Sequence, residues 1–278
     1  MKKKNDTFVI INKKQHKMKH FNTFSEHRKV GNHDKYLRNS MCMKIFIAIL
    51  LTIVFKLNVH SQNSPEEHFK IGLRQFTIEN YVEAEMSFTK AIRINNEESK
   101  YFYYRGRCYV KQNKLFLAKN DFSKAIKLDP NNARYYAYRA NVNNLDSDFT
   151  QALVDCNQAI ELDPNYSFAY LQRGIAKISQ EDYRGGILDF NKTIEIDPYS
   201  ASAYCNRGAA KAELKRYNEA LIDINKALEI DSKMADAYHN RGYIRCMIGQ
   251  KEKGCLDLSK AGELGSINAY YLIQKLCN

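Results

Sequence analysis

The chain has 278 residues, and 43 Lys and Arg against 31 Asp and Glu give it a formal net charge of +12. Residues 1–61 hold 13 of the basic and 3 of the acidic residues, so 30 basic and 28 acidic residues leave only +2 for the rest of the chain. A nucleic-acid-binding surface concentrates positive charge on the folded part of a protein. The distribution therefore gives no support to a nucleic-acid partner, and we expect none.

Residues 1–40 form a basic leader that is rich in lysine and lacks periodic apolar residues. Such a composition does not bury enough apolar surface to fold, so we expect a disordered segment. An unfolded segment without cysteine does not hold metal-ligand geometry, so its histidines predict no metal site. These histidines are His16, His20, His27 and His33. The alternative is that residues 1–40 are not translated and that the protein starts at Met41 or Met43.

Residues 41–61 have the pattern of a secretory signal peptide. Lys44 precedes an apolar run over 45–55, and Ser61 is the small residue ahead of the expected cleavage point. The run is short for a bilayer span. We therefore expect an exported protein, periplasmic or secreted. The alternative is an uncleaved membrane anchor, and we expect contact with a membrane only through this segment.

After a linker at 62–64, a pattern with a period of 34 residues fills 65–268. Small and bulky residues recur at positions 8, 20, 24, 27 and 32 of each unit, which in the second unit are Gly106, Ala118, Phe122, Ala125 and Pro130. A fixed period of this length predicts a helical repeat array. The six units are 65–98, 99–132, 133–166, 167–200, 201–234 and 235–268.

Each unit is predicted to hold two helices, because its apolar residues recur at helical spacing. Helix A is expected over about positions 2–14 and helix B over about positions 15–29. The small residue at position 8 lets helix B approach helix A closely. Cys156 occupies the bulky position 24 of its unit and is expected to fill the core.

Two charged positions recur together in units two to six. The first unit has Ile71 and Ser87 at these positions instead. Because arginine at position 7 and aspartate at position 23 appear and vanish together, we predict a ladder of Arg–Asp pairs, within or between units. The alternative is a row of arginines that grips an acidic ligand, which a guanidinium already paired with a carboxylate cannot do. The residues are Arg105, Arg139, Arg173, Arg207 and Arg241, with Asp121, Asp155, Asp189, Asp223 and Asp257.

Residues 269–278 begin like a seventh helix A and are predicted to form a capping helix over the last helix B. Cys255 and Cys277 each lie 11 residues from the turn near Ser266, on opposite arms of an antiparallel hairpin. They are therefore expected to lie level with each other. A disulfide between them is a hypothesis that also requires their Cβ atoms to face each other. It would stabilise the attachment of the capping helix by about 3 kcal/mol.

The unit resembles the tetratricopeptide repeat, which has the same period and the same residue types at the five recurring positions. Position 4, usually aromatic in that family, holds Phe102, Tyr136, Tyr170, Tyr204 and Tyr238, whereas the first unit has His68. The resemblance covers 204 of the 278 residues. It implies an all-α fold, a right-handed α-solenoid of six tetratricopeptide helical hairpins plus a C-terminal capping helix. The C-terminal end looks like those of exported repeat proteins of Gram-negative bacteria.

In this family, positions 2, 5, 9 and 12 of helix A line a concave groove. The resemblance therefore implies a non-catalytic scaffold that binds a peptide or protein segment in that groove. The groove would be apolar in the middle, with basic and polar groups on its N-terminal side. Its residues would be Tyr103, Arg107, Arg134, Asn141, Phe168, Leu171, Ile175, His239 and Tyr243. The alternatives are that these side chains pack against neighbouring helices, and that the array is a structural or assembly subunit of a cell-envelope complex using its convex or end faces.

The sequence contains no GxSxG, phosphate-loop, HExxH or CxxC motif. Cys205 and His239 share position 5 of adjacent units, but equivalent positions in neighbouring repeats are too far apart for a nucleophile and its base. We therefore expect no enzyme, no cofactor and no metal ion. Asn206 and Asn240 match one position of the carboxylate clamp of some tetratricopeptide domains, but the basic positions of that clamp are not filled in register.

Overall fold

The computed structural model describes residues 41, 43–52 and 64–277. The chain divides into two units, Met1–Ser61 and Gln62–Asn278, and the described part of the first is a helical segment at 41 and 43–52. Among the helices that the structure describes, none is both long and apolar enough to cross a membrane. The basic leader and the end of the predicted signal segment lie outside the described residues, so both stay predictions.

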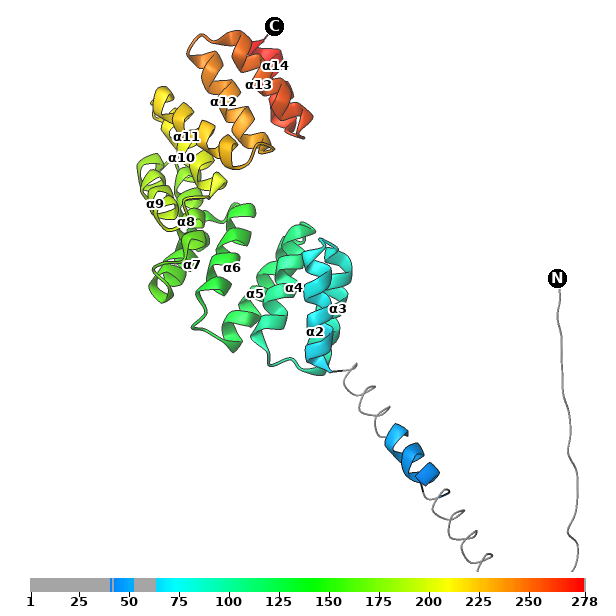
Figure 1. Ribbon diagram of the computed structural model, residues 1–278. Coiled ribbons are helices and arrows are strands. Elements are labelled where there is room, and N and C mark those ends of the chain that lie inside the picture. The colour runs from blue at the N-terminus through cyan, green and yellow to red at the C-terminus, as the bar shows by residue number, and fades with distance from the viewer. Residues whose placement is uncertain (1–40, 42, 53–63, 278) are drawn as a thin grey trace, which may run out of the picture. The chain divides into compact units, whose positions relative to one another are not determined.

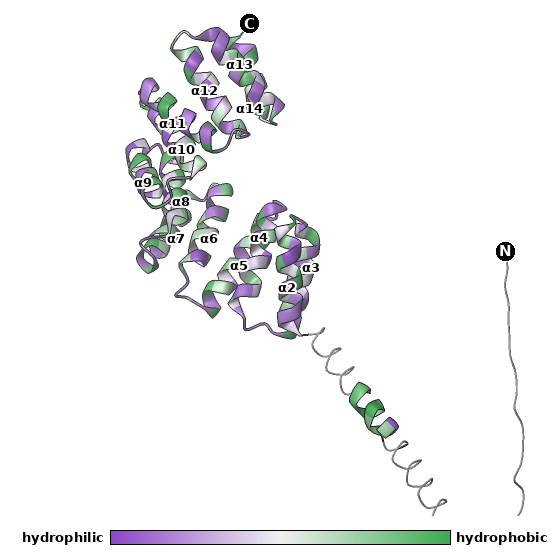
Figure 2. Ribbon diagram, in the orientation of Figure 1, coloured by the Kyte–Doolittle hydropathy of each residue, from purple (hydrophilic) through white to green (hydrophobic). Residues whose placement is uncertain are grey.

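Every described element of the second unit is an α-helix, and consecutive helices pair into hairpins (Figure 1). The A helices are α2 (Pro65–Thr77), α4 (Ser99–Lys111), α6 (Ala133–Leu145), α8 (Ser167–Ser179), α10 (Ala201–Glu213) and α12 (Ala235–Met247). The B helices are α3 (Tyr81–Ile94), α5 (Leu115–Leu128), α7 (Phe149–Leu162), α9 (Tyr183–Ile196), α11 (Tyr217–Ile230) and α13 (Lys251–Glu263), and α14 (Ile267–Leu276) follows them. The predicted helical repeat solenoid is confirmed. Figure 2 shows hydrophobic and hydrophilic residues together along these helices, as amphipathic packing requires.

Each B helix begins about two residues later than predicted, because the turn before it contains a left-handed residue. Position 15 has a positive φ in every hairpin, at Glu79, Asn113, Ser147, Glu181, Lys215 and Gly249. For the five residues other than glycine, φ lies between 57° and 64°. This conformation costs an L-residue roughly 1–2 kcal/mol. The packing of helix B against helix A must therefore offset that cost five times.

The small residue at position 8 permits the close packing of the two helices in a hairpin. A Cβ added to Gly106 would come within 2.9 Å of the Phe122 ring, so a side chain there would displace the ring. Unit three instead has the larger residue, Ala140, at position 8. It packs in one cluster with Cys156 at position 24, which is smaller than the phenylalanine found there in unit two. Cys156 is fully buried, which confirms that it fills the core. Volume is thus conserved across the pair of positions, as a close-packed interior requires.

The predicted Arg–Asp ladder is present and connects helices both within and between units. Arg139 donates from Nε and Nη2 to the two carboxylate oxygens of Asp155, at 2.9 and 2.7 Å. Its third nitrogen, Nη1, donates at 3.1 Å to Ser123 on helix B of the preceding unit. The other four arginines repeat this arrangement, with Thr89, Asn157, Asn191 and Asn225 as the partners in the preceding unit. Because these guanidinium groups are occupied, the ladder is structural.

The C-terminal helix α14 contacts both α12 and α13, as a capping helix does. It buries Ala269 completely, but Ile267, Tyr270 and Tyr271 are exposed. Cys277 at its C-terminal end is joined to α13 through a disulfide with Cys255, with a Cα–Cα distance of 5.8 Å. The apolar contact of α14 with the array is small, so this covalent bond carries much of its attachment.

Candidate functional site

The A helices lie on the inner side of the array. Each A helix contacts the next A helix, whereas successive B helices are not in contact with each other. Elements that approach each other more closely must lie on the inside of a curved stack. We call the surface formed by α2, α4, α6, α8, α10 and α12 the inner face.

One arginine on the inner face is surrounded by aromatic rings. The Arg107 guanidinium on α4 lies 4.6 Å from the ring centre of Phe76, 5.1 Å from Tyr138, 5.4 Å from Tyr104 and 5.5 Å from Tyr103. These rings come from three successive A helices, α2, α4 and α6. We call these five residues the Arg107 cluster. Within the part of the chain that the structure describes, Arg107 has no carboxylate partner.

Tyrosine hydroxyls extend the cluster toward the next unit. Burial raises the pKa of Tyr103 and of Tyr166, and the neighbouring Tyr138 raises both further. The positive charge of Arg107 opposes this rise at both tyrosines, and that of Arg134 opposes it at Tyr166. Both hydroxyls therefore stay protonated at neutral pH. The charges of Arg107 and Arg134 thus both act on the Tyr166 hydroxyl, and positive charge of this kind beside a hydroxyl group is suited to a carboxylate.

The structure brings together four of the predicted residues, three from the N-terminal side of the inner face and Phe168 from the predicted middle. Tyr103 is only 6% exposed and packs within the Arg107 cluster. The Phe168 ring centre lies 4.9 Å from that of Tyr138, which joins α8 to the cluster. Arg134 is exposed at the start of α6. These residues therefore lie in one connected region.

The other predicted residues lie in separate places. Leu171 is 9% exposed and packs with Ile175 in the core around Phe190, and Tyr243 packs against the core of units five and six. His239 is half-buried, its Nδ1 has no hydrogen-bond partner among the residues that the structure describes, and burial lowers its pKa. Asn141 is also half-buried. The apolar middle of the predicted groove is thus largely core, which leaves the N-terminal region as the candidate site.

Sequence reasoning missed four aromatic residues of this region. Tyr104 and Tyr138 occupy position 6 of helix A, Phe76 lies in the last turn of α2, and Tyr166 directly precedes α8. Position 6 was not among the positions expected to line the groove. A signal was nevertheless present, because position 6 is aromatic only in units two and three.

Two matches to family models fall on units of the 34-residue period. Two different models, both described as "Tetratricopeptide repeat", match residues 99–132 and residues 201–234. The chain is a tetratricopeptide repeat protein. No curated protein sequence matches it.

Solved structures of other tetratricopeptide repeat proteins have a similar fold. A chain of the APC/C hetero-tetramer Cut9-Hcn1 superimposes with a TM-score of 0.74 at 14% identity, over 82% of this chain and 46% of that chain. This protein therefore spans 46%, or about half, of the length of that chain. A tetratricopeptide repeat protein from Parabacteroides merdae gives 0.65 at 21% identity, covering 77% and 84% of the two chains. Pseudomonas aeruginosa pilF gives 0.63 at 14% identity, covering 76% and 96%.

Cys205 is not poised as a nucleophile, although it shares position 5 of helix A with His239 of the next unit. Burial raises the pKa of the Cys205 thiol to about 12, and the side-chain amide of Asn240 donates to its sulfur at 3.5 Å. A thiol that stays protonated at neutral pH is a poor nucleophile. The Asn240 side chain is therefore engaged with the core.

Proposed function

We propose that this protein is a non-catalytic scaffold that binds an extended acidic protein segment on its inner face, with the Arg107 cluster as the anchor. Tetratricopeptide repeats generally mediate protein–protein interaction, and this proposal adds the face, the anchor and the charge of the partner. The observation that carries it is an arginine held by four rings and paired with no carboxylate among the described residues.

Cation–π contacts hold the Arg107 guanidinium in place without satisfying its hydrogen-bonding capacity. An arginine has five N–H donors in a fixed fork. The rings accept charge through their faces, but they do not accept the in-plane hydrogen bonds that a carboxylate accepts. A glutamate or aspartate of a partner would provide this pair, while its apolar neighbours would pack on the exposed edges of the rings. The site is therefore already ordered for an acidic segment.

The test uses two fluorescent synthetic peptides of equal length, one alternating Glu with Leu and the other Gln with Leu. The full chain should bind the Glu peptide more tightly, because only this peptide offers carboxylates to Arg107. Arg107→Gln should weaken the binding of the Glu peptide by about tenfold, since a hydrogen bond to a charged group contributes roughly 1.5–3 kcal/mol. Fluorescence anisotropy titration measures both affinities.

The matched control is Arg93→Gln, which removes an exposed arginine in the last turn of α3 and lowers the net charge equally. This variant should bind like the wild type. Equal binding of the two peptides, or an equal loss in both variants, would show that the Arg107 cluster is not an acidic-segment anchor.

A second candidate function uses the opposite surface of the array. Position 22 of helix B carries an exposed apolar residue in five of the six units, each between 56% and 71% exposed. These residues, which we call the outer stripe, are Met86, Val154, Leu188, Ile222 and Leu256. Repeated exposed apolar side chains favour an assembly surface over a solvated one.

A hollow of about 400 Å³ adjoins the outer stripe at Leu188 and is also lined by Arg184 and Arg216. This observation supports a structural or assembly subunit that binds through its convex face. Leu188→Glu together with Leu256→Glu should then abolish assembly with the native partner while leaving the Glu peptide bound. Loss of peptide binding in this variant would instead indicate misfolding or a single shared surface.

We also propose that the protein is exported. The apolar run after Lys44 and the disulfide in an otherwise thiol-bearing array support this location, because disulfides persist in oxidising compartments. Intact mass and N-terminal sequencing of the protein from its native host test the proposal. A mature chain that starts near Gln62 in the exported fraction is expected, and a chain that retains residues 1–61 in the cytosol would contradict it.

A further inference from the structure

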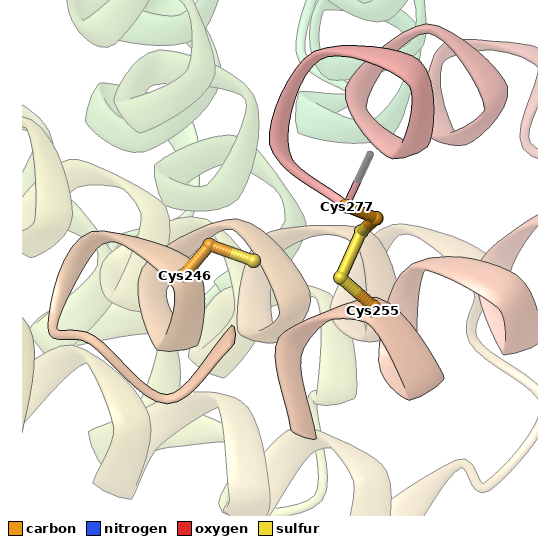
Figure 3. A group of neighbouring side chains, drawn as sticks. All are labelled: Cys246, Cys255 and Cys277. Carbon is orange, nitrogen blue, oxygen red and sulfur yellow. A yellow bond between two sulfur atoms is a disulfide. The ribbon is translucent and has the colours of Figure 1, made fainter. Parts of the chain in front are cut away.

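Three cysteine sulfurs meet at the C-terminal end of the array. Cys246 lies near the end of α12, Cys255 lies on α13, and Cys277 caps α14. Their Sγ atoms all lie within 4.8 Å of one another, and Figure 3 shows the Cys246 side chain directed toward the disulfide of the other two. Three separate helices thus deliver one sulfur each to a common point.

The space for the third sulfur comes from a glycine. A Cβ added to Gly254 would come within 2.4 Å of the Cys246 Sγ, so only glycine leaves room for this thiol. Position 20 is alanine in four of the other five units. All three cysteines are half-buried, so the sulfurs are partly shielded from solvent without being enclosed in the core.

We propose that, when the disulfide is reduced, the three cysteines bind one thiophilic metal ion of the Zn²⁺ class. Thiolates are the preferred ligands of such ions. A Zn–S bond of about 2.3 Å places the three sulfurs about 4 Å apart. The observed grouping within 4.8 Å reaches this spacing once the sulfur–sulfur bond opens, with little movement of the helices. Three protein ligands leave one position of a tetrahedral ion for water.

The disulfide-bonded state and the metal-bound state of the three cysteines exclude each other. A dithiol reductant gives two electrons and two protons to the Cys255–Cys277 bond, which becomes two thiols while the reductant becomes a cyclic disulfide. The ion then displaces the protons of three thiols as it forms three metal–sulfur bonds. In the oxidised state only Cys246 offers a free thiol among the three, so the metal does not bind.

Metal binding gives α14 a second means of attachment. The sulfur of Cys277 is its covalent tether in the oxidised state, and the same sulfur becomes a ligand in the reduced state. The end of the array is therefore held in oxidising surroundings by a bond and in reducing surroundings by an ion.

The test is a titration of the full chain with Co²⁺, which reports thiolate ligands through charge-transfer absorption in the near ultraviolet. The protein is reduced with a dithiol, which is removed without oxygen before the metal is added. Reduced wild type should show the absorption and saturate at one ion per chain, and Zn²⁺ should displace the Co²⁺. The oxidised wild type should show none. Cys246→Ser should weaken binding by at least tenfold, because even the loss of an indirect partner of a metal ligand costs about 10–100-fold.

Cys205→Ser is the matched control, because it removes a thiol that lies outside the cluster. It should bind like the wild type. Thermal melting provides a second readout, since Zn²⁺ should raise the midpoint of the reduced wild type by more than that of reduced Cys246→Ser. No absorption in the reduced wild type, equal binding in Cys246→Ser, or an equal loss in Cys205→Ser would each overturn the proposal.

Discussion

The ladder between helices A and B and the Arg107 cluster on the inner face use the same side chain in opposite ways. Arg105 and Arg107 are two residues apart on α4, and both are half-buried. Arg105 forks onto Asp121 at 2.8 Å, whereas Arg107 has four aromatic rings around it and no carboxylate among the described residues. An arginine paired within its own chain is structural, and one without such a partner retains its capacity for an external anion.

The largest effect that separates the two regions should come from a rung of the ladder. Arg139→Gln leaves the Asp155 side chain, which is 2% exposed, with only the Asn143 amide as a donor. An uncompensated buried charge costs about 3 kcal/mol or more. Urea unfolding followed by circular dichroism measures the loss. The double variant with Asp155→Asn should lose less of the free energy of unfolding, because no buried charge is left without a partner. A loss below about 1 kcal/mol in the single variant would mean that the ladder contributes little to stability.

Removing the disulfide should cause a slightly smaller loss of stability. The disulfide lies at the C-terminal end of the array, where the ladder of Arg–Asp pairs ends. The helix α14 begins a seventh unit but has no arginine rung of its own. Cys277→Ser should therefore weaken the attachment of α14 by about 3 kcal/mol and leave the rest of the array folded. Hydrogen exchange resolved by mass spectrometry should show faster exchange in α14 alone. Loss of protection throughout the array would mean that α14 supports more than its own contacts.

The smallest effect on stability should come from Arg107→Gln. Partly exposed cation–π contacts contribute about 0.5–1 kcal/mol, and no buried carboxylate loses its partner. Urea unfolding beside Arg139→Gln gives the direct comparison, and the expected result is a small stability loss combined with a large binding loss. If both variants lost equal stability, Arg107 would be a structural residue like the arginines of the ladder. The distinction between a structural ladder and a binding cluster would then be wrong.

The repeat pattern predicted the helix packing and the Arg–Asp ladder well, because both depend on contacts that recur with the 34-residue period. The pairing of Arg139 with Asp155 was visible as joint recurrence, and the complementarity of position 8 with position 24 was visible as residue size. The left-handed residue at position 15 was not visible, because five different residue types adopt it and packing alone imposes it.

The candidate site was harder to predict because it departs from the period. The setting of Arg107 depends on Phe76 in the preceding unit and Tyr138 in the following one, so no single unit contains it. Cys246 was missed for a similar reason, since its significance depends on Cys255 of the same unit and on Cys277 beyond the last unit. Family positions named Leu171 as a groove residue, but the structure buries it in the core. Features that occur once in a repetitive chain need the tertiary structure to be recognised.

The hydrogen bond from each ladder arginine to the preceding unit has a consequence for how such a gene can change in length. The acceptor always stands at position 25 and is a hydroxyl or an amide in every case, at Thr89, Ser123, Asn157, Asn191 and Asn225. An in-frame deletion of 133–166 would bring Arg173 opposite Ser123, which exchanges one acceptor for another and leaves no rung open. The junction created by loss or duplication of a whole 34-residue unit is therefore expected to keep a complete rung, because the spacing from arginine to acceptor repeats with the period. One whole hairpin is thus a change in length that the ladder can accommodate without an unpaired arginine.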